Sequence, residues 1–175
     1  MLPMRIAIRR ARLSEVPRLS RLLGLIWRKT FSGLLSRRAI REVSRRWHSG
    51  KHLAGQVLDR ECFFGVAEDG RGRILGLTTL RRTGRSCAFM LRLYVRPGCQ
   101  GAGLGERLLS AGWRACPGLR RMRLEVLSGN PRAIAFYRRH GFRRVGRRRE
   151  PLGEEALELV VMEKRVPLAQ AKPRD

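Results

Sequence analysis

The chain has 175 residues, enough for one domain with a sizeable core, and its hydrophobic content of 43% excludes a wholly disordered chain. Its 39 lysines and arginines against 14 aspartates and glutamates give a formal net charge of +25. This balance favours polyanionic partners such as nucleic acid, ribosomes, an acidic membrane surface or a phosphorylated cofactor. The alternative is a solvent-exposed surface that is rich in arginine and has no such partner. The cysteines and histidines stand in no metal-binding spacing, so no metal is expected.

The N-terminal segment carries arginines but no apolar stretch of signal-peptide length, and no run in the chain approaches 18 apolar residues. We therefore expect a cytoplasmic protein that does not insert into a membrane. Residues 5–9 alternate modestly between apolar and polar side chains, which predicts a short first strand.

Two amphipathic helices are predicted next. Ser14 stands where an N-cap is expected, and apolar residues then recur at spacings of three and four until Gly33. Ser36 is the predicted cap of the second helix, which turns arginines outward and stops at Gly50. Residues 48–60 have no clear period and are predicted to form a loop.

An antiparallel meander follows. Asp69 and Gly70 separate two apolar runs, residues 63–67 and 74–80, which is a strong hairpin signal. A further turn leads into residues 86–95, an apolar, aromatic and β-branched segment that predicts a well-buried strand.

A glycine-rich segment, residues 100–105, links this strand to a helix that extends to about Ala115. A helix start has unpaired N–H groups and the positive end of the macrodipole, and glycines let a ligand approach closely, so the segment predicts a phosphate site. The dinucleotide fingerprint needs glycine where Glu106 stands, and an ATP loop needs a lysine that is absent here. Both of these readings are therefore excluded.

The second half predicts a strand at residues 121–127 and a helix opened by Asn130 and Pro131, with Gly141 as its C′ residue. Strands near residues 142–145 and 156–162, joined by a polar turn, complete the domain. A helix links strands 86–95 and 121–127, so these two should be parallel. We predict an α+β fold with a mixed sheet in a single domain over residues 1–166, followed by a flexible tail at 167–175.

Several separate motifs resemble the GCN5-related N-acetyltransferase (GNAT) family. Their residues are Gln-x-x-Gly-x-Gly at 100–105 after a strand ending Leu-x-Val-x-Pro, then Leu124-Glu125-Val126, Asn130, Ala133, Phe136-Tyr137-Arg138 and Gly141-Phe142. The resemblance is continuous over residues 86–164. It implies a mostly antiparallel sheet of about seven strands, with splayed parallel central strands and about four flanking helices. It also implies that acetyl-coenzyme A, the cosubstrate, binds in the gap between these two splayed strands.

The resemblance also implies catalytic roles. Tyr137 would be the general acid that protonates the coenzyme A thiolate, and the alternative is an aromatic ring packed on a helix face. Glu125 would be the base, because its spacing to Tyr137 resembles the pair in bacterial alanine acetyltransferases that modify a ribosomal protein. The alternatives are a base acting through water and a Glu125 that simply pairs with an arginine. A backbone N–H near Tyr94 or Val95 would bind the oxyanion.

Binding of the cosubstrate is implied for three groups of residues. The pantetheine and pyrophosphate would be held by backbone groups of the strand and by side-chain or backbone groups of the loop. Asn130 would contact the pantetheine arm. Arginines would pair with the remaining phosphate charge. These residues are Leu93, Tyr94, Val95, Gln100, Gly101, Ala102, Gly103, Leu104, Gly105, Asn130, Arg132 and Arg138, with Arg96 as a further arginine.

The expected reaction is direct attack of a primary amine on acetyl-coenzyme A in a ternary complex. The acceptor is either a protein or peptide N-terminus or a small amine. Residues 147–153 lack the paired tyrosines of the alanine acetyltransferases, which argues against a peptide acceptor. Arginines in the pocket would disfavour a polycationic acceptor and would suit one that bears a carboxylate or phosphate. The rival hypothesis, motivated by charge, is a catalytically silent protein of this fold that binds ribosome or nucleic acid. The oligomeric state stays open.

Overall fold

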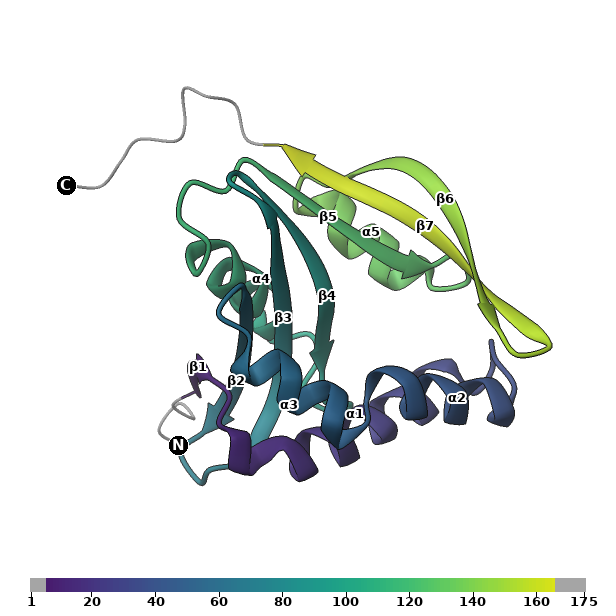
Figure 1. Cartoon of the computed structure of the whole chain (residues 1–175), viewed down its shortest axis with the longest axis horizontal. Coiled ribbons are helices and arrows are strands. Elements are labelled where there is room, and N and C mark those ends of the chain that lie inside the picture. The colour runs from purple at the N-terminus through teal and green to yellow at the C-terminus, as the bar shows by residue number, and fades with distance from the viewer. Residues whose placement is uncertain (1–5, 166–175) are drawn as a thin grey trace.

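Residues 6–165 are described by a computed structural model, in which one mixed seven-stranded sheet carries helices on both faces (Figure 1). The strand order is β1-β2-β3-β4-β5-β7-β6, and β4 and β5 are the parallel pair. The strands are β1 (Ile6–Arg10), β2 (Cys62–Asp69), β3 (Ile74–Gly84), β4 (Cys87–Val95), β5 (Arg121–Leu127), β6 (Arg143–Leu152) and β7 (Glu155–Arg165). The helices are η1 (Leu13–Glu15), α1 (Val16–Phe31), α2 (Arg37–Trp47), α3 (Gly50–Leu58), α4 (Leu104–Arg114) and α5 (Pro131–Arg139). The predicted fold class is confirmed.

Three helices, one more than predicted, precede the first hairpin. Ser36 caps α2 as expected, because its Oγ accepts a hydrogen bond from the N–H of Ala39 at 3.0 Å. Ser49 caps α3 in the same way, so the predicted loop over residues 48–60 is wrong. The segment shows no clear period, but Leu53 is fully buried among residues of α1 and β2. Tertiary packing therefore outweighs the weak helical propensity of the segment.

The start of α1 also differs from the prediction. Ser14 lies inside the single 3₁₀ turn that precedes α1 and does not cap the helix. The nearby carboxylate of Glu15 instead accepts the N–H of Arg12 at 2.8 Å and pairs with Arg9 at 2.7 Å. A carboxylate that accepts hydrogen bonds from two donors holds this turn more firmly than a serine hydroxyl would.

The first hairpin turns where the sequence predicts. Asp69 ends β2, and its Oδ1 accepts hydrogen bonds from the N–H groups of Arg71 at 3.0 Å and Arg73 at 2.9 Å. This aspartate therefore fixes the turn with its side chain, as turn-forming aspartates commonly do.

The last hairpin is longer than predicted. We expected a turn over residues 147–153, but β6 continues to Leu152 and pairs with β7 along its length. It is an edge strand, and most of its side chains are exposed. Its order comes from backbone pairing with β7 and not from an apolar face, so the arginine-rich sequence carries no strand signal.

The two central strands part after a short parallel contact. β4 pairs with β5 only over residues 87–90 and 121–124. On its other side, β4 has Met90 opposite Leu80 and Arg92 opposite Thr79, so Leu91 is an extra residue that forms a bulge. A bulge bends its strand, and the pairing with β5 ends at this point. Figure 1 shows the two strands diverging toward α1.

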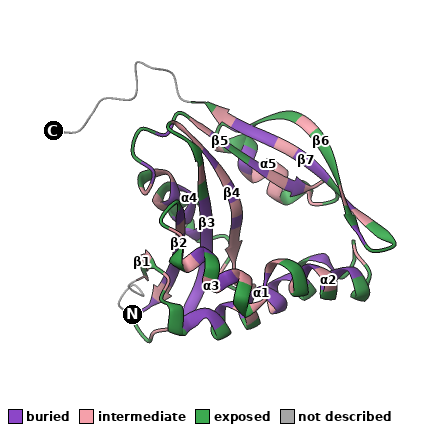
Figure 2. Cartoon of the chain, viewed as in Figure 1, coloured by how far each residue is buried: buried purple, intermediate pink, exposed green. Residues whose placement is uncertain are grey.

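The core lies on both faces of the sheet, and buried residues concentrate on the strands and on the inward sides of α1 and α4 (Figure 2). Leu109 of α4 and Tyr137 of α5 belong to one face, and Leu19 of α1 and Leu53 of α3 to the other. Within residues 6–165, no helix has the length and apolar content needed to cross a membrane. The predicted tail at 167–175 lies outside the described residues.

Candidate active site

A cavity of about 810 Å³ lies where β4 and β5 part. It is walled by the second halves of these two strands, the loop before α4, one side of α5, the C-terminal turns of α1, and β7. Of the predicted site residues, those that line it are Leu93, Tyr94, Val95, Gln100, Gly101, Gly103, Leu104, Gly105, Glu125, Asn130, Arg132 and Tyr137. Ala102 and Arg138 do not line it.

Two residues of β4, Leu93 and Val95, point their backbone N–H and C=O groups toward the gap between β4 and β5. The N–H of Arg96 donates to the carbonyl of Leu75 on β3 at 2.7 Å. Hydrogen-bonding groups of a strand alternate in direction, so Tyr94 also turns its N–H and C=O toward β3. Those of Leu93 and Val95 therefore point toward β5, which no longer pairs with them. One wall of the gap thus offers backbone donors and acceptors.

One end of the cavity, the α4 end, is formed by residues 100–105. Gly101 and Gly103 have φ angles of +88° and +72°, a conformation that favours glycine. Gly103 is the N-cap of α4 and no side chain bonds the first turn, so its N–H groups stay open. Gln100 folds back and donates to the carbonyl of Val95 at 3.3 Å, which ties the loop to β4. Open N–H groups and the helix macrodipole together make an anion site.

Two cationic side chains of α5 belong to the cavity wall. Arg132 and Arg139 line the cavity and lie two helical turns apart, on the same face of α5. Arg138 is exposed on another face, so the structure does not place it beside the anion site. Arg96 is engaged elsewhere, because its Nε donates to the carbonyl of Ile74 at 3.2 Å.

Asn130 lines the cavity at the start of α5. Its Oδ1 accepts the N–H of Ala133 at 3.1 Å, so it is the predicted N-cap of this helix. The cap uses the oxygen of the amide and leaves its two N–H donors for other partners.

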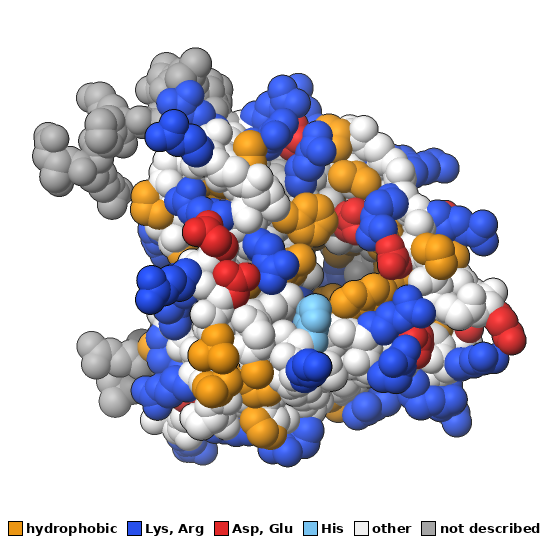
Figure 3. Space-filling model, viewed as in Figure 1, with side chains coloured by type: hydrophobic (Ala, Val, Ile, Leu, Met, Phe, Trp, Pro, Cys, Tyr) orange, Lys and Arg blue, Asp and Glu red, His pale blue; other side chains and the backbone are white. Residues whose placement is uncertain are grey.

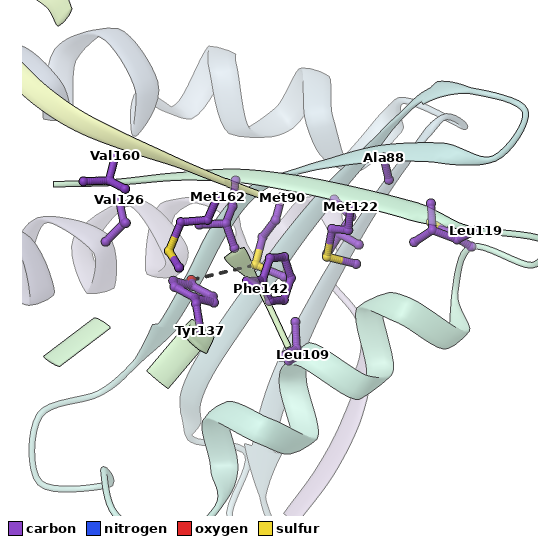
Figure 4. Packing of buried hydrophobic residues seen from close by; sticks show 13 residues of the cluster. Ala88, Met90, Leu109, Leu119, Met122, Val126, Tyr137, Phe142, Val160 and Met162 are labelled. Carbon is purple, nitrogen blue, oxygen red and sulfur yellow. Dashed lines mark hydrogen bonds between the residues drawn. The ribbon is translucent and has the colours of Figure 1, made fainter. Parts of the chain in front are cut away.

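Tyr137 projects from α5 into the packed residues beside the parting strands (Figure 4). Its hydroxyl contacts Sδ of Met90 at 3.8 Å, and its ring lies edge-on to Phe136 and Phe142. Burial raises the pKa of Tyr137 above its ordinary value, with the phenol of Tyr94 as a second cause. The hydroxyl is therefore protonated at neutral pH. A thioether is a weak acceptor, so this O–H can turn to a stronger one.

Glu125 lies on the opposite face of β5 from the buried Met122 and Leu124, as its alternation with them predicts. Arg148 of β6 reaches across β7 and binds both carboxylate oxygens, with Nε to Oε1 at 2.6 Å and Nη2 to Oε2 at 2.7 Å. Arg148 also donates to Glu150. Glu125 therefore pairs with an arginine, which is the stated alternative to a catalytic role.

The other end of the cavity, the α1 end, is mostly apolar. Two polar side chains of α1, Lys29 and Thr30, line it together with Glu125. Its apolar residues are Ile26, Trp27, Phe31, Leu127, Leu157 and Leu159. Most of these belong to one packed cluster, in which α1 meets β7.

A buried polar cluster adjoins this end, and its Arg92 also lines the cavity. Arg92 is 5% exposed; one of its nitrogens donates to Oε1 of Gln56 at 2.5 Å and another to the carbonyl of Trp47. Burial lowers the pKa of Arg92 to about 10, so it remains charged at neutral pH. His48 lies edge-on to Trp27 at 5.5 Å, and burial, with Arg92 as the second cause, lowers its pKa to about 3. A neutral histidine therefore backs the indole of Trp27.

Comparison with known families decides the relationship. The model of the acetyltransferase (GNAT) family matches residues 23–142, which span the parting strands, the glycine loop and Tyr137. The chain belongs to the acetyltransferase (GNAT) family. The predicted family is thereby confirmed, and with it the class of enzyme, an acyl-coenzyme A-dependent N-acetyltransferase. No curated protein sequence matches this GNAT chain.

Solved structures agree with this GNAT fold. The PaiA N-acetyltransferase of Thermoplasma acidophilum, in complex with coenzyme A, has a TM-score of 0.81 at 23% identity, covering 93% of this chain and 100% of its own. The ribosomal-protein-S18-alanine N-acetyltransferase of Escherichia coli has a TM-score of 0.72 at 18% identity, covering 98% and 100%. A spermidine N-acetyltransferase SpeG chimera from Vibrio cholerae and hSSAT has a TM-score of 0.65 at 18% identity, covering 91% and 95%.

Sequence reasoning missed several residues that line or adjoin the cavity of this GNAT enzyme. Arg139 and His140 follow from the face of α5 that carries Arg132, so helical spacing could have found them. Leu157 and Leu159 come from β7, and no local motif marks them. Arg148 stands among neighbouring arginines, and only its contact with Glu125 distinguishes it.

Proposed function

We propose that this GNAT enzyme transfers the acetyl group of acetyl-coenzyme A directly to a primary amine in a ternary complex, in the cytoplasm. The observation that carries the proposal is one cavity with three successive features. An open helix N-terminus lies at the α4 end, backbone donors of β4 and the phenol of Tyr137 lie along it, and an apolar α1 end closes it. These features match a pyrophosphate, a thioester and an acceptor, in that order.

The cosubstrate would be held mainly by backbone. Its pyrophosphate fits the N–H groups around Gly101, Gly103 and Gly105, with Arg132 and Arg139 to balance the remaining charge. The amide-bearing pantetheine arm fits the edge of β4, whose groups at Leu93 and Val95 face the gap. The free N–H donors of Asn130 could meet the same arm.

The chemistry follows from the residues beside that edge. The amine nitrogen attacks the thioester carbonyl, and the oxyanion takes a hydrogen bond from a β4 backbone N–H. Strand alternation favours the N–H of Val95 or Leu93 over that of Tyr94 for this donor. The C–N bond forms, the C–S bond breaks, and Tyr137 gives its proton to the departing thiolate. Its raised pKa suits an acid and not a base.

Glu125 is the proposed acceptor of the amine proton, and it would act through water. Both of its oxygens are bound by Arg148, so direct transfer requires that this guanidinium move aside. A water held against the carboxylate needs a smaller change. Lysine-type amines have pKa values near 10 and N-termini near 8, so a base is needed at neutral pH.

The acceptor is either a protein or peptide N-terminus or a small amine. The basic surface in Figure 3, where lysine and arginine side chains spread over the visible face, would also suit a substrate bound to ribosomal RNA. A purely binding protein would not need the phenol of Tyr137 beside an open gap. The α1 end offers Glu125 as a carboxylate, already paired with Arg148, which argues against a polyamine acceptor.

Thermal unfolding with acetyl-coenzyme A tests the cosubstrate, because a ligand that binds only the folded state stabilises it by about 2.7 kcal/mol at 100 times its Kd. Acetylpantetheine, which lacks the phosphates, is the matched control and should raise the Tm much less. A mass-spectrometric screen of peptides and small amines then identifies the product. An unchanged Tm at millimolar acetyl-coenzyme A would refute the proposal.

A further inference from the structure

The ion pair between Glu125 and Arg148 lies at the α1 end of the cavity, where the acceptor amine would arrive. Glu125 lines the cavity with its side chain 19% exposed, and the side chain of Arg148 is 45% exposed. Ion pairs open to solvent contribute little to folding, so stability alone is a weak reason for this one. Glu125 lines the cavity, and Arg148 meets that wall through its contact with Glu125.

The surroundings of this pair are mostly apolar, and Lys29 and Thr30 of α1 are the polar side chains beside it. Trp27, Phe31, Leu157 and Leu159 line the same end, and they would accept a hydrophobic group. Among the cavity residues, the carboxylates are Glu125 at this end and Glu106 at the α4 end. A polyamine therefore meets one carboxylate that already has a cationic partner. A ligand with both charges meets a partner for each.

Resting on the acetyltransferase function proposed above, we propose that the acceptor is a small zwitterion, an α-amino acid with an apolar side chain, recognised by exchange with this ion pair. The ammonium of the acceptor takes the place of the guanidinium on Glu125, and its carboxylate binds Arg148. The exchange conserves the number of opposite-charge contacts. The planar guanidinium matches a carboxylate in a bidentate contact, as it already does with Glu125.

Arg148 is placed to make this exchange. It stands on the edge strand β6, where nothing pairs on the outer side within the described sheet, and half of its side chain is open to solvent. Its second partner, Glu150, lies on the same strand and can keep the guanidinium near the cavity when Glu125 is released. Arg148 thus binds the acceptor and does not touch the thioester.

The same arrangement prepares the amine for reaction. Glu125 holds the ammonium, one proton passes through a water to the carboxylate and on to solvent, and the neutral nitrogen attacks the thioester carbon. As the C–S bond breaks, the nitrogen loses its second proton by the same route, and Tyr137 regains a proton from solvent after it protonates the thiolate. The products are an N-acetylamino acid and coenzyme A, whose thiolate is protonated by Tyr137. A peptide N-terminus would present an amide carbonyl where the amino acid presents a carboxylate, so it would leave Arg148 without an anion.

Calorimetric binding to the enzyme with and without coenzyme A tests the inference without requiring turnover. Leucine and leucinamide share the amine and the side chain and differ in the carboxylate. We expect leucine to bind about tenfold more tightly than leucinamide, because a charge-assisted contact is worth more than a neutral one. Spermidine should bind more weakly than leucine.

Arg148→Gln should abolish the preference for leucine, whereas Arg149→Gln should preserve it. Arg149 is the matched control, because it stands on the same strand, is exposed and pairs with Glu158 at 3.1 Å. Equal binding of leucine and leucinamide, no binding of either, or an unchanged preference in Arg148→Gln would overturn the inference.

The turnover assay separates this inference from the proposed function. If leucinamide, spermidine or a peptide is acetylated as efficiently as leucine, the enzyme is an acetyltransferase and the zwitterion assignment is wrong. If no amine is acetylated and coenzyme A does not bind, the proposed function fails, and leucine binding to the free protein still decides the role of Arg148.

Discussion

The two ends of the cavity are built from different parts of the chain. The α4 end comes from one continuous segment, residues 100–105, and its binding groups belong mainly to the backbone. The α1 end combines side chains of α1, β5 and β7 with a guanidinium from β6. A backbone site binds one invariant chemical group, whereas a side-chain site can be altered by single substitutions. The difference suits an enzyme that shares its cosubstrate with relatives and chooses its own acceptor.

Tyr137 lies between the two ends, and its loss is expected to have the largest effect. Tyr137→Phe should lower kcat by about 100-fold or more, because general acids contribute about 10²–10⁴-fold. The affinity for coenzyme A should stay within about twofold, since ring packing is preserved. Steady-state kinetics and calorimetry measure the two quantities.

Tyr94→Phe is the control for this substitution, because Tyr94 also carries a phenol and lines the same cavity, while its backbone groups face β3. It should leave kcat within severalfold of the original. Equal kcat losses in the two variants would mean that neither phenol acts as a specific acid.

The α1 end depends on a neutral His48, and the α4 end does not. His48 has a pKa of about 3 in the folded state against 6.5 in the unfolded chain, so the unfolded state binds the proton first as pH falls. As pH falls from 6.5 to 4.5, this group should reduce the free energy of unfolding with a slope that grows from about 0.7 to about 1.4 kcal/mol per pH unit. Urea unfolding at pH 6.5, 5.5 and 4.5 measures the slope.

His48→Asn should flatten that slope, because the titrating group is removed. Half-buried His52, whose pKa is also lowered, keeps part of the dependence. Carboxylates with lowered pKa values, such as Glu15 at about 2, lose their contribution mainly below pH 4.5. If the original protein and the variant show the same slope over this window, His48 is not buried as a neutral ring.

Two arginines of α5 give the smallest predicted effect and the finest test of the α4 end. Arg132→Ala should weaken coenzyme A binding by about 3–10-fold, and less so at high salt, because it removes an exposed contact to phosphate. Arg138→Ala removes the same charge from a face that does not line the cavity. It should leave the Kd unchanged, so equal losses would indicate only a general effect of net charge.

Much of the fold could be predicted because its signals are local. Asn130 caps its helix and Gly141 ends it with φ of +85°, and both roles were read from neighbouring residues. α3 and the second half of β6 were not predictable in this way. Leu53 stabilises α3 by packing against distant elements, and β6 is ordered by its pairing with β7. Such long-range contacts produce no hydrophobic periodicity in the neighbouring sequence.

In the candidate site, too, residues marked by local motifs could be predicted and residues brought together by long-range contacts could not. The glycine loop and Tyr137 carry compact motifs, and their positions were predicted from the sequence. The contact between Arg148 and Glu125 is set by the order β5-β7-β6, which places two separated residues on one face. One arginine in a run of arginines offers no signal for that contact. The motif Phe136-Tyr137-Arg138 predicts Arg138 for this site, whereas the helical face that carries Arg132 brings Arg139 to the cavity.

The exposed β6 strand has a consequence for the protein's behaviour at high concentration. An edge strand offers unpaired N–H and C=O groups to any other strand, and this favours aggregation. The outward arginines of β6, including Arg143, Arg144 and Arg147, place like charges where a second copy would have to dock. Part of the +25 charge therefore acts as protection against self-association. The arginines that make the chain unusually basic also keep its sheet from growing.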